Sequence, residues 1–421
     1  MRPGPQRWLA PVATPKAEHW VTAARSYAQA PTMDGFGDLW CVLLHRHKTT
    51  QASRSMWLAR SADAGSTWQT VVEVPFAWSE SAGLVGRPQD PNLYLACGGG
   101  LPGDRWMSAM FAAYDVRTGS WHPPTYLQKA TGEHDQYHVW DLAAAADGTL
   151  AATIGTRAAP PPPWPGPWSS GVQYLRPGAT EWTTPMPLYA GRNVVWPQAQ
   201  WVGSEVRFSL RTQVSSPPVP IHPALLMVDA DAAGAPGRAT ELTPIAGPDQ
   251  RGSFTAHSLV MAADGGCSVL YTAYGVGNLQ SALELAYVPP TSREPRQAPA
   301  RRIEVCVDAS MPAGEVAHEN FALVRGPGSH VIAIYSLFSE RHRALYRRTF
   351  DQGEPLEPPR EIARSELAGA FARITAMRDE RFATRVEALV SAEAEALGLG
   401  VRAILRPGPN RNRWVIPHRS R

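Results

Sequence analysis

Short runs of alternating apolar and polar residues recur along this chain, and each run opens on an aromatic residue or a histidine. Strict alternation is typical of a β-strand with one buried face. The openings lie at His19, Trp78, His138, Trp196, His257 and His318, and from Trp78 onward they are 58 to 61 residues apart. This spacing predicts an internal repeat of about 60 residues.

A second set of positions recurs with the same period but at a different place in each unit, close to the unit's last strand. It falls near Trp68, Trp121, Trp182, Leu242, Arg302 and Arg360. Each unit has room for four short strands, which in the third unit are predicted at residues 138–146, 148–156, 171–178 and 180–188. Two markers on one period support the repeat independently of each other.

The chain holds 40 Pro and 35 Gly, which suits many short strands joined by tight turns. Four-stranded sheets repeated radially form a β-propeller. We therefore predict an all-β fold, a six-bladed β-propeller whose repeats span residues 14–362. Residues 7–12 are expected to pair with the last blade and close the ring.

The C-terminal part of the chain has a different pattern. Its apolar residues recur at steps of three, four, seven and eight, which is typical of an amphipathic helix over residues 365–397. We therefore divide the chain into a propeller domain (residues 1–362) and a C-terminal extension (residues 363–421) with a helix and two short strands. A seventh blade over residues 366–418 is the alternative. The helix offers a surface for a protein partner.

Composition and charge limit the classes of function. The 40 Lys and Arg nearly balance 37 Asp and Glu, giving a net charge of +3, so no nucleic-acid partner is expected. No apolar run approaches the 18 residues of a membrane helix, and no membrane partner is expected. The four Cys lie far apart and no metal-ligand spacing occurs, so we predict no metal and no cofactor. With no signal peptide apparent, a cytoplasmic protein is expected, or a secreted one if a leader has been removed.

One segment points to a known family. The sequence SADAGSTW at residues 61–68 matches the Asp-box pattern SxDxGxTW, and here the chain resembles the sialidase superfamily with its bacterial neuraminidase repeats. YDVRTGSW at residues 114–121 resembles a second, diverged copy. In such a turn Asp63 would accept backbone hydrogen bonds, Gly65 would supply a positive φ, and Trp68 would pack between blades.

The resemblance also implies a kind of active site. Sialidases hold the sugar carboxylate with three arginines, use a Tyr–Glu nucleophile pair and an Asp acid/base, and carry an Arg-Ile-Pro motif near the start. This sequence has no such motif, so no catalytic residue is transferred by it.

The topology of a propeller selects candidate residues instead. Loops into the innermost strands and loops between second and third strands surround the mouth of the central channel, where ligands usually bind. Arg46, Arg157 and Arg211 follow apolar second strands in three units, and convergent guanidinium groups bind carboxylates well. His318 and Trp164 complete the predicted substrate-binding set, which suits a glycan or another acidic saccharide.

Several functions remain open at this stage. A sialidase-like glycoside hydrolase acting on acidic sugars is the leading one, with Glu133 or Asp135 (or Asp141 or Glu319) as acid/base and Tyr271 or Tyr274 as nucleophile. A non-catalytic carbohydrate-binding or protein-interaction propeller is the first alternative. A uronate polysaccharide lyase is the second, with His138 or His257 as the base. Whether the protein is an enzyme is left open.

Overall fold

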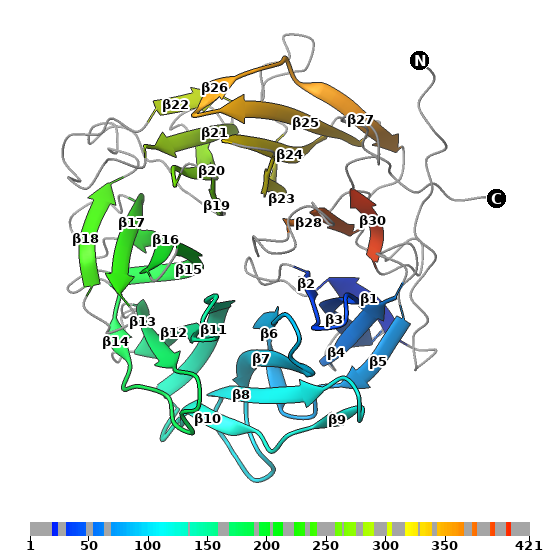
Figure 1. Ribbon diagram of the computed structural model, residues 1–421, viewed down its shortest axis with the longest axis vertical. Coiled ribbons are helices and arrows are strands. Elements are labelled where there is room, and N and C mark those ends of the chain that lie inside the picture. The colour runs from blue at the N-terminus through cyan, green and yellow to red at the C-terminus, as the bar shows by residue number, and fades with distance from the viewer. Residues whose placement is uncertain are drawn as a thin grey trace.

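The computed structural model is built from strands arranged in a ring (Figure 1). The elements of the described residues are all β-strands, which confirms the predicted all-β propeller. The structure describes residues 19–23, 31–47, 54–62, 69–133, 135–158, 168–188, 193–202, 205–213, 223–231, 236–241, 257–262, 265–274, 281–289, 301–304, 316–326, 329–338, 343–365, 373–376, 388–391 and 401–405.

The first three sheets follow one another along the chain, each from an innermost strand outward. The first holds β1 (His19–Ala23), β2 (Thr32–Met33), β3 (Leu39–His47), β4 (Arg54–Ser61) and β5 (Gln69–Glu73). The second holds β6 (Ala77–Gly86), β7 (Asn92–Gly99), β8 (Ser108–Asp115), β9 (Ser120–Trp121) and β10 (Thr125–Gln128). The third holds β11 (Asp135–Ala144), β12 (Leu150–Ala158), β13 (Trp168–Leu175) and β14 (Met186–Pro187).

The remaining sheets continue the same order. The fourth holds β15 (Asn193–Val202), β16 (Glu205–Gln213), β17 (Pro223–Asp231) and β18 (Pro236–Glu241). The fifth holds β19 (His257–Met261), β20 (Cys267–Tyr274), β21 (Ser281–Val288) and β22 (Arg301–Glu304). The sixth holds β23 (Val316–Arg325), β24 (His330–Phe338), β25 (Arg343–Asp351), β26 (Glu354–Pro355) and β27 (Arg360–Ser365), and the last holds β28 (Arg373–Ala376), β29 (Ala388–Ser391) and β30 (Val401–Leu405).

Every sheet is antiparallel, and from the second to the sixth sheet the first strand lies nearest the centre of the ring. In Figure 1, β6, β11, β15, β19 and β23 lie toward the centre, and β5, β14, β18 and β22 lie at the outer edge. The four strands expected in the third repeat all overlap observed strands, β11 to β14. A repeat with period-2 alternation and short turns thus folds as one sheet, as predicted.

The C-terminal part differs from the prediction where it is described. Residues 373–376 and 388–391, which fall within the predicted helix, are the paired strands β28 and β29, with Ile374 opposite Val390. β28 contacts β23 of the sixth sheet, and β30 contacts β1 of the first. Pairing between these strands, together with contact with neighbouring sheets, outweighs local helix propensity there. Residues 7–12 lie outside the described residues, and the domain division at residue 362 stays a prediction.

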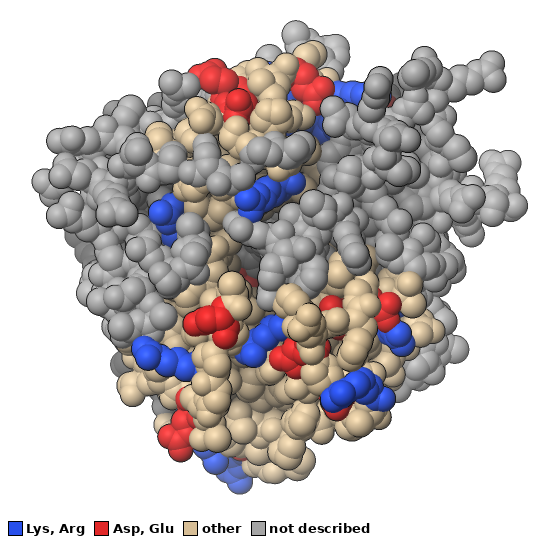
Figure 2. Space-filling view, in the orientation of Figure 1, with Lys and Arg blue, Asp and Glu red and all other residues tan. Residues whose placement is uncertain are grey.

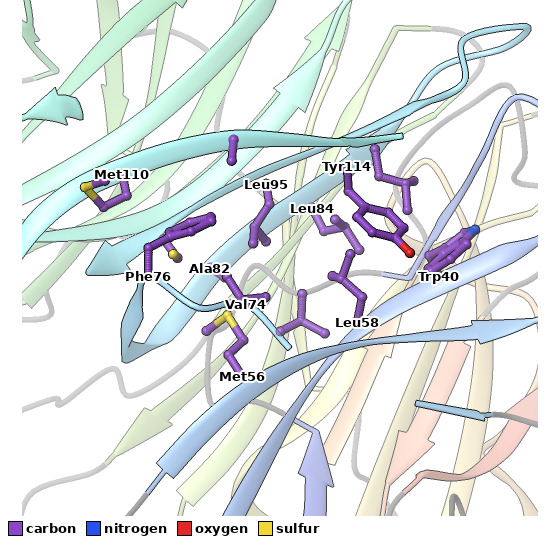
Figure 3. Packing of buried hydrophobic residues seen from close by; sticks show 14 residues of the cluster. Trp40, Met56, Leu58, Val74, Phe76, Ala82, Leu84, Leu95, Met110 and Tyr114 are labelled. Carbon is purple, nitrogen blue, oxygen red and sulfur yellow. The ribbon is translucent and has the colours of Figure 1, made fainter. Parts of the chain in front are cut away.

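The core lies between neighbouring sheets rather than inside any one of them. Between the first and second sheets, the buried side chains of Trp40, Leu58, Phe76, Leu95 and Tyr114 interdigitate (Figure 3). Similar clusters lie between the second and third sheets and between the fifth and sixth. Because the second and third sheets each bury both faces against their neighbours, neither repeat could form this core alone.

Side chains on β2, β11, β15 and β19 also tie four pairs of neighbouring sheets together, the first to the second and the third through the sixth in turn. Each accepts a hydrogen bond from a backbone N–H of the following innermost strand, 54 to 65 residues further along the chain. These innermost strands are sheet edges, and the acceptors satisfy donors that would otherwise be unpaired. The pairs are Gly86 N with Thr32 Oγ1 (2.9 Å), Ala199 N with Asp141 Oδ2 (2.8 Å), Leu259 N with Gln198 Oε1 (3.1 Å), Met261 N with Gln200 Oε1 (3.1 Å) and Leu323 N with Ser258 Oγ (3.0 Å).

The turn at residues 114–121, which was predicted to be a diverged copy of the motif, is held by hydrogen bonds to Asp115. Asp115 Oδ1 accepts hydrogen bonds from the backbone N–H groups of Arg117 (2.8 Å) and Thr118 (3.3 Å), and Gly119 has a φ of +69°. The Trp121 Nε1–H donates to the Glu73 carbonyl of the first sheet at 3.0 Å. The hydrogen bonds that Asp115 accepts, above all the one from the Arg117 N–H, hold the pKa of this carboxyl below its ordinary value. Asp63, Gly65 and Trp68 lie outside the described residues, so their roles stay predictions.

Among the residues that the structure describes, Cys41, Cys97 and Cys267 are buried and form no disulfide. Burial raises the pKa of the Cys41 and Cys97 thiols, so both stay protonated at neutral and mildly alkaline pH. We expect neither to react with iodoacetamide in the native protein up to pH 9, and both to react after unfolding in guanidinium. Peptide mass spectrometry measures this. Native labelling of either cysteine at the rate of the unfolded chain would contradict the packing described here.

Candidate active site

The backbone places several of the predicted site residues at one end of the ring. At this end, which we call the entry rim, the innermost strands begin and the second strands end: Asp135 pairs with Ala158, and His257 pairs with Tyr271. Arg46, Arg157 and Arg211 each lie within two residues of the end of a second strand, in β3, β12 and β16. The backbone therefore places the three arginines at equivalent positions of three sheets.

Four innermost strands are irregular close to the entry rim. Their register shifts between Ala77 and Ala82, Val139 and Asp141, Val195 and Gln198, and Val316 and Phe321. Bulges of this kind redirect side chains and recur beside binding sites. Three of the residues that open the repeats, Trp78, Trp196 and His318, fall within these irregular stretches.

The third sheet places a histidine on an aromatic support. The His138 ring stacks on Trp140 with a centroid separation of 5.3 Å and an interplanar angle of 19°. His138 pairs with Gly155 of β12, where an added Cβ would lie only 2.1 Å from Trp140 Nε1. The missing side chain at Gly155 is what lets the bulged Trp140 lie there. Both rings are partly exposed, so the imidazole can meet a ligand at the rim.

Other predicted residues lie close to His138 in the fold. Arg157 pairs with Gln136, two residues along β12 from Gly155, which is roughly 7 Å along the strand. Asp135 opens β11, and Glu133 is exposed just before it. The third sheet thus brings four sequence-predicted residues to one part of the entry rim.

Asp141 has a structural role instead of the acid/base role considered for it. It is fully buried, and its carboxylate accepts backbone hydrogen bonds from Leu142 and Ala199, both at 2.8 Å. A carboxylate engaged in this way inside the core cannot reach a substrate.

Tyr271 donates a hydrogen bond to Glu284 of β21, with 2.6 Å between Oη and Oε2. Tyr271 is fully buried among Leu259, Val269 and Ala286, while Glu284 is partly exposed. The pair lies on the second and third strands of the fifth sheet, not on the innermost one. A tyrosine and a carboxylate are therefore in contact, but the hydroxyl is covered.

The remaining candidates are placed only by backbone. His257 opens β19 opposite Tyr271, Tyr274 ends β20, and His318 lies in β23. Trp164 lies outside the described residues, and the roles of all four stay predictions. The sequence reasoning did not identify Trp140 and Glu284 as site residues. Gly155 could have pointed to Trp140, because a lone glycine inside a strand often marks a place where another group lies close against the backbone.

On the face shown in Figure 2, the described Lys and Arg side chains are interspersed with Asp and Glu. They form no extended basic surface there, in keeping with the net charge of +3. In the part of the chain that the structure describes, no three His, Cys, Asp or Glu residues are grouped to hold a metal. Within the same part, no helix has the length and apolar character needed to span a membrane.

Comparison with known proteins gives matches only at the level of structure. No family model matches the chain, and no curated protein does. An ulvan lyase, a polysaccharide lyase bound to -[GlcA(1-4)Rha3S]-, aligns with a TM-score of 0.56 at 9% identity, covering 96% of this chain and 94% of that one.

Two further structures align less closely. The α-L-arabinanase of Penicillium chrysogenum, complexed with arabinobiose, gives a TM-score of 0.49 at 13% identity, covering 94% of this chain and 97% of that one. The Trypanosoma rangeli sialidase, in complex with sialic acid, gives 0.45 at 13% identity, and the match covers 83% of this chain and 58% of the sialidase. The alignment with the ulvan lyase, along nearly the full length of both chains, shows that the two proteins share a fold.

Proposed function

We propose that the protein cleaves acidic polysaccharides at its entry rim by β-elimination, with His138 as the base. The observation that carries the proposal is the partly exposed His138 ring, held on Trp140 at the start of an innermost strand. A base must be held in one orientation and remain accessible, and this stack meets both needs.

The chemistry suits a uronate. His138 would remove the proton from the carbon next to the sugar carboxylate, and that electron pair would form a carbon–carbon double bond. The bond from the adjacent carbon to the glycosidic oxygen would break, and the leaving oxygen would take up the proton from the imidazolium. Arg157, which shares this part of the third sheet, would neutralise the carboxylate and so make the proton easier to remove.

The ulvan lyase supports this choice of substrate class. Its structure aligns along nearly the full length of this chain, and the saccharide bound to it contains glucuronate. A glucuronate-containing polysaccharide is therefore the substrate class that we propose. We also propose that the ring has seven blades, because β28–β30 form a sheet that contacts both the sixth and the first.

Hydrolysis by a sialidase-like mechanism is the second candidate, and the Tyr271–Glu284 hydrogen bond favours it. Tyr271 would be the nucleophile, with Glu133 or Asp135 as acid/base. This mechanism requires the buried Tyr271 hydroxyl to become accessible when the substrate binds. Elimination needs no such rearrangement, so we rank it first.

Incubation with a panel of glucuronate-containing polysaccharides and sialosides tests the proposal. We expect ultraviolet absorbance from an unsaturated uronate to rise with at least one uronate polysaccharide. Release of free sialic acid without unsaturated product would favour hydrolysis. Binding of a glycan with no product of either kind would contradict both reactions and indicate a carbohydrate-binding propeller.

A further inference from the structure

One exposed tryptophan at the entry rim has no role in the reaction proposed above. Trp78 lies in the irregular stretch of β6 and has 45% of its surface exposed. A large aromatic ring left open to water beside a candidate active site commonly marks a contact surface.

The Trp78 ring packs against the backbone of Gly100. A Cβ added at Gly100 would lie 2.6 Å from both Cη2 and Cζ2 of the indole, so the ring rests on a residue with no side chain. The Gly100 N–H donates to the Phe76 carbonyl at 2.9 Å, which fixes this loop against the start of β6. The indole is therefore held in place before any ligand arrives, which lowers the entropic cost of stacking on it.

Polar groups lie next to this ring. The Cβ of Asp104 is 3.0 Å from the position of the added Gly100 Cβ. Asp104 Oδ2 accepts hydrogen bonds from the Leu101 N–H (2.7 Å) and the Tyr126 hydroxyl (2.8 Å). These hydrogen bonds, above all the one from the Leu101 N–H, lower the pKa of Asp104, so its carboxyl group stays ionised at neutral pH. A fixed carboxylate accepts sugar hydroxyl groups and repels a second carboxylate.

The loop that carries Gly100 and Asp104 also contacts the strand that carries His138. The backbone N–H of Tyr137, the residue before His138, donates to the Met107 carbonyl at 2.9 Å, and Met107 ends the loop that carries Gly100 and Asp104. Trp78 and His138 are thus linked across two neighbouring sheets on one rim.

We propose that Trp78 forms a stacking subsite for an uncharged sugar of the polysaccharide, beside the uronate bound at His138. The apolar face of the pyranose would lie on the indole, and Asp104 would accept its hydroxyl groups and exclude an acidic sugar. This inference rests on the proposed function, because it takes His138 as the position of the reacting uronate.

Two polysaccharides and four variants test the subsite. Hyaluronan alternates glucuronate with an uncharged sugar, whereas alginate contains only uronates. Calorimetric titration should show tighter binding of hyaluronan, with Trp78→Ala weakening it about tenfold and Trp78→Phe retaining most of it. Asp104→Asn should reduce the ratio of the affinity for hyaluronan to the affinity for alginate. Phe36→Ala serves as the control, because Phe36 is 60% exposed in the turn after β2, away from the entry rim, and should change nothing.

The outcomes separate this inference from the proposed function. If hyaluronan binds Trp78→Ala and the wild type equally well while the wild type cleaves it, the subsite is wrong and the reaction stands. If the wild type binds without cleaving and Trp78→Ala loses binding, the subsite stands and the reaction is wrong. Equal affinity of the wild type for alginate and hyaluronan, or binding of neither, overturns the uncharged-sugar subsite. A melting temperature matching that of the wild type shows that each variant is folded.

Discussion

Replacing His138 with alanine is expected to lower kcat/KM on the cleaved polysaccharide by about 100- to 10,000-fold, the usual contribution of a positioned base. The loss should appear mainly in kcat, because the imidazole would act in the transition state more than in ground-state binding. Trp140 should still occupy the space over Gly155, so the rim keeps much of its shape.

Steady-state kinetics of His138→Ala beside His330→Ala measures this effect. His330 opens β24 at the opposite end of the ring from the entry rim, which makes it a matched histidine control. We expect the control to retain wild-type kinetics. A His138→Ala enzyme with kcat/KM within about twofold of the wild type would exclude His138 as the base.

Replacing Asp141 with alanine is expected to lower the free energy of unfolding by about 3 kcal/mol, because each hydrogen bond to a charged group is worth roughly 1.5–3 kcal/mol. The buried carboxylate accepts the N–H groups of Leu142 and Ala199, and the second bond joins the third sheet to the fourth. Asp141→Asn keeps one acceptor oxygen, so its free energy of unfolding should fall by roughly half as much as that of Asp141→Ala.

Urea unfolding of the two Asp141 variants measures this loss, with Glu181→Gln as the control. Glu181 is exposed in the same sheet's β13–β14 connection, and surface changes of this kind usually stay within about 0.5 kcal/mol. If Asp141→Ala were as stable as Glu181→Gln, the hydrogen bonds between innermost strands would contribute little to holding the ring together.

The fold was largely predictable because it is repetitive. Alternation and turn residues identify the strands of the third sheet, and the 60-residue period matches the separation of the inter-sheet bonds, such as the 61 residues between Gln198 and Leu259. The segment around Ile374 and Val390 was predicted as a helix. Its apolar spacing follows the period of a helix, and only its pairing partner and neighbouring sheets make it a strand.

The candidate site was predictable in its topology but not in its contacts. Strand order alone indicates that His138 and Arg157 share the entry rim of one sheet. It does not indicate that Tyr271 is buried against Glu284, because burial depends on packing around the fifth sheet. The sequence pattern also does not locate the bulge that carries Trp140. One extra residue inverts the alternation, but the four alanines that follow at residues 143–146 offer no contrast of apolar and polar residues in which to see it.

Product analysis in water labelled with oxygen-18 tests elimination at the entry rim most directly. Hydrolysis adds a water molecule across the broken bond, whereas elimination adds none. We expect fragments from a glucuronate polysaccharide to carry an unsaturated uronate and no heavy oxygen, and to disappear in the His138→Ala variant. Saturated fragments that contain oxygen-18 would contradict the account.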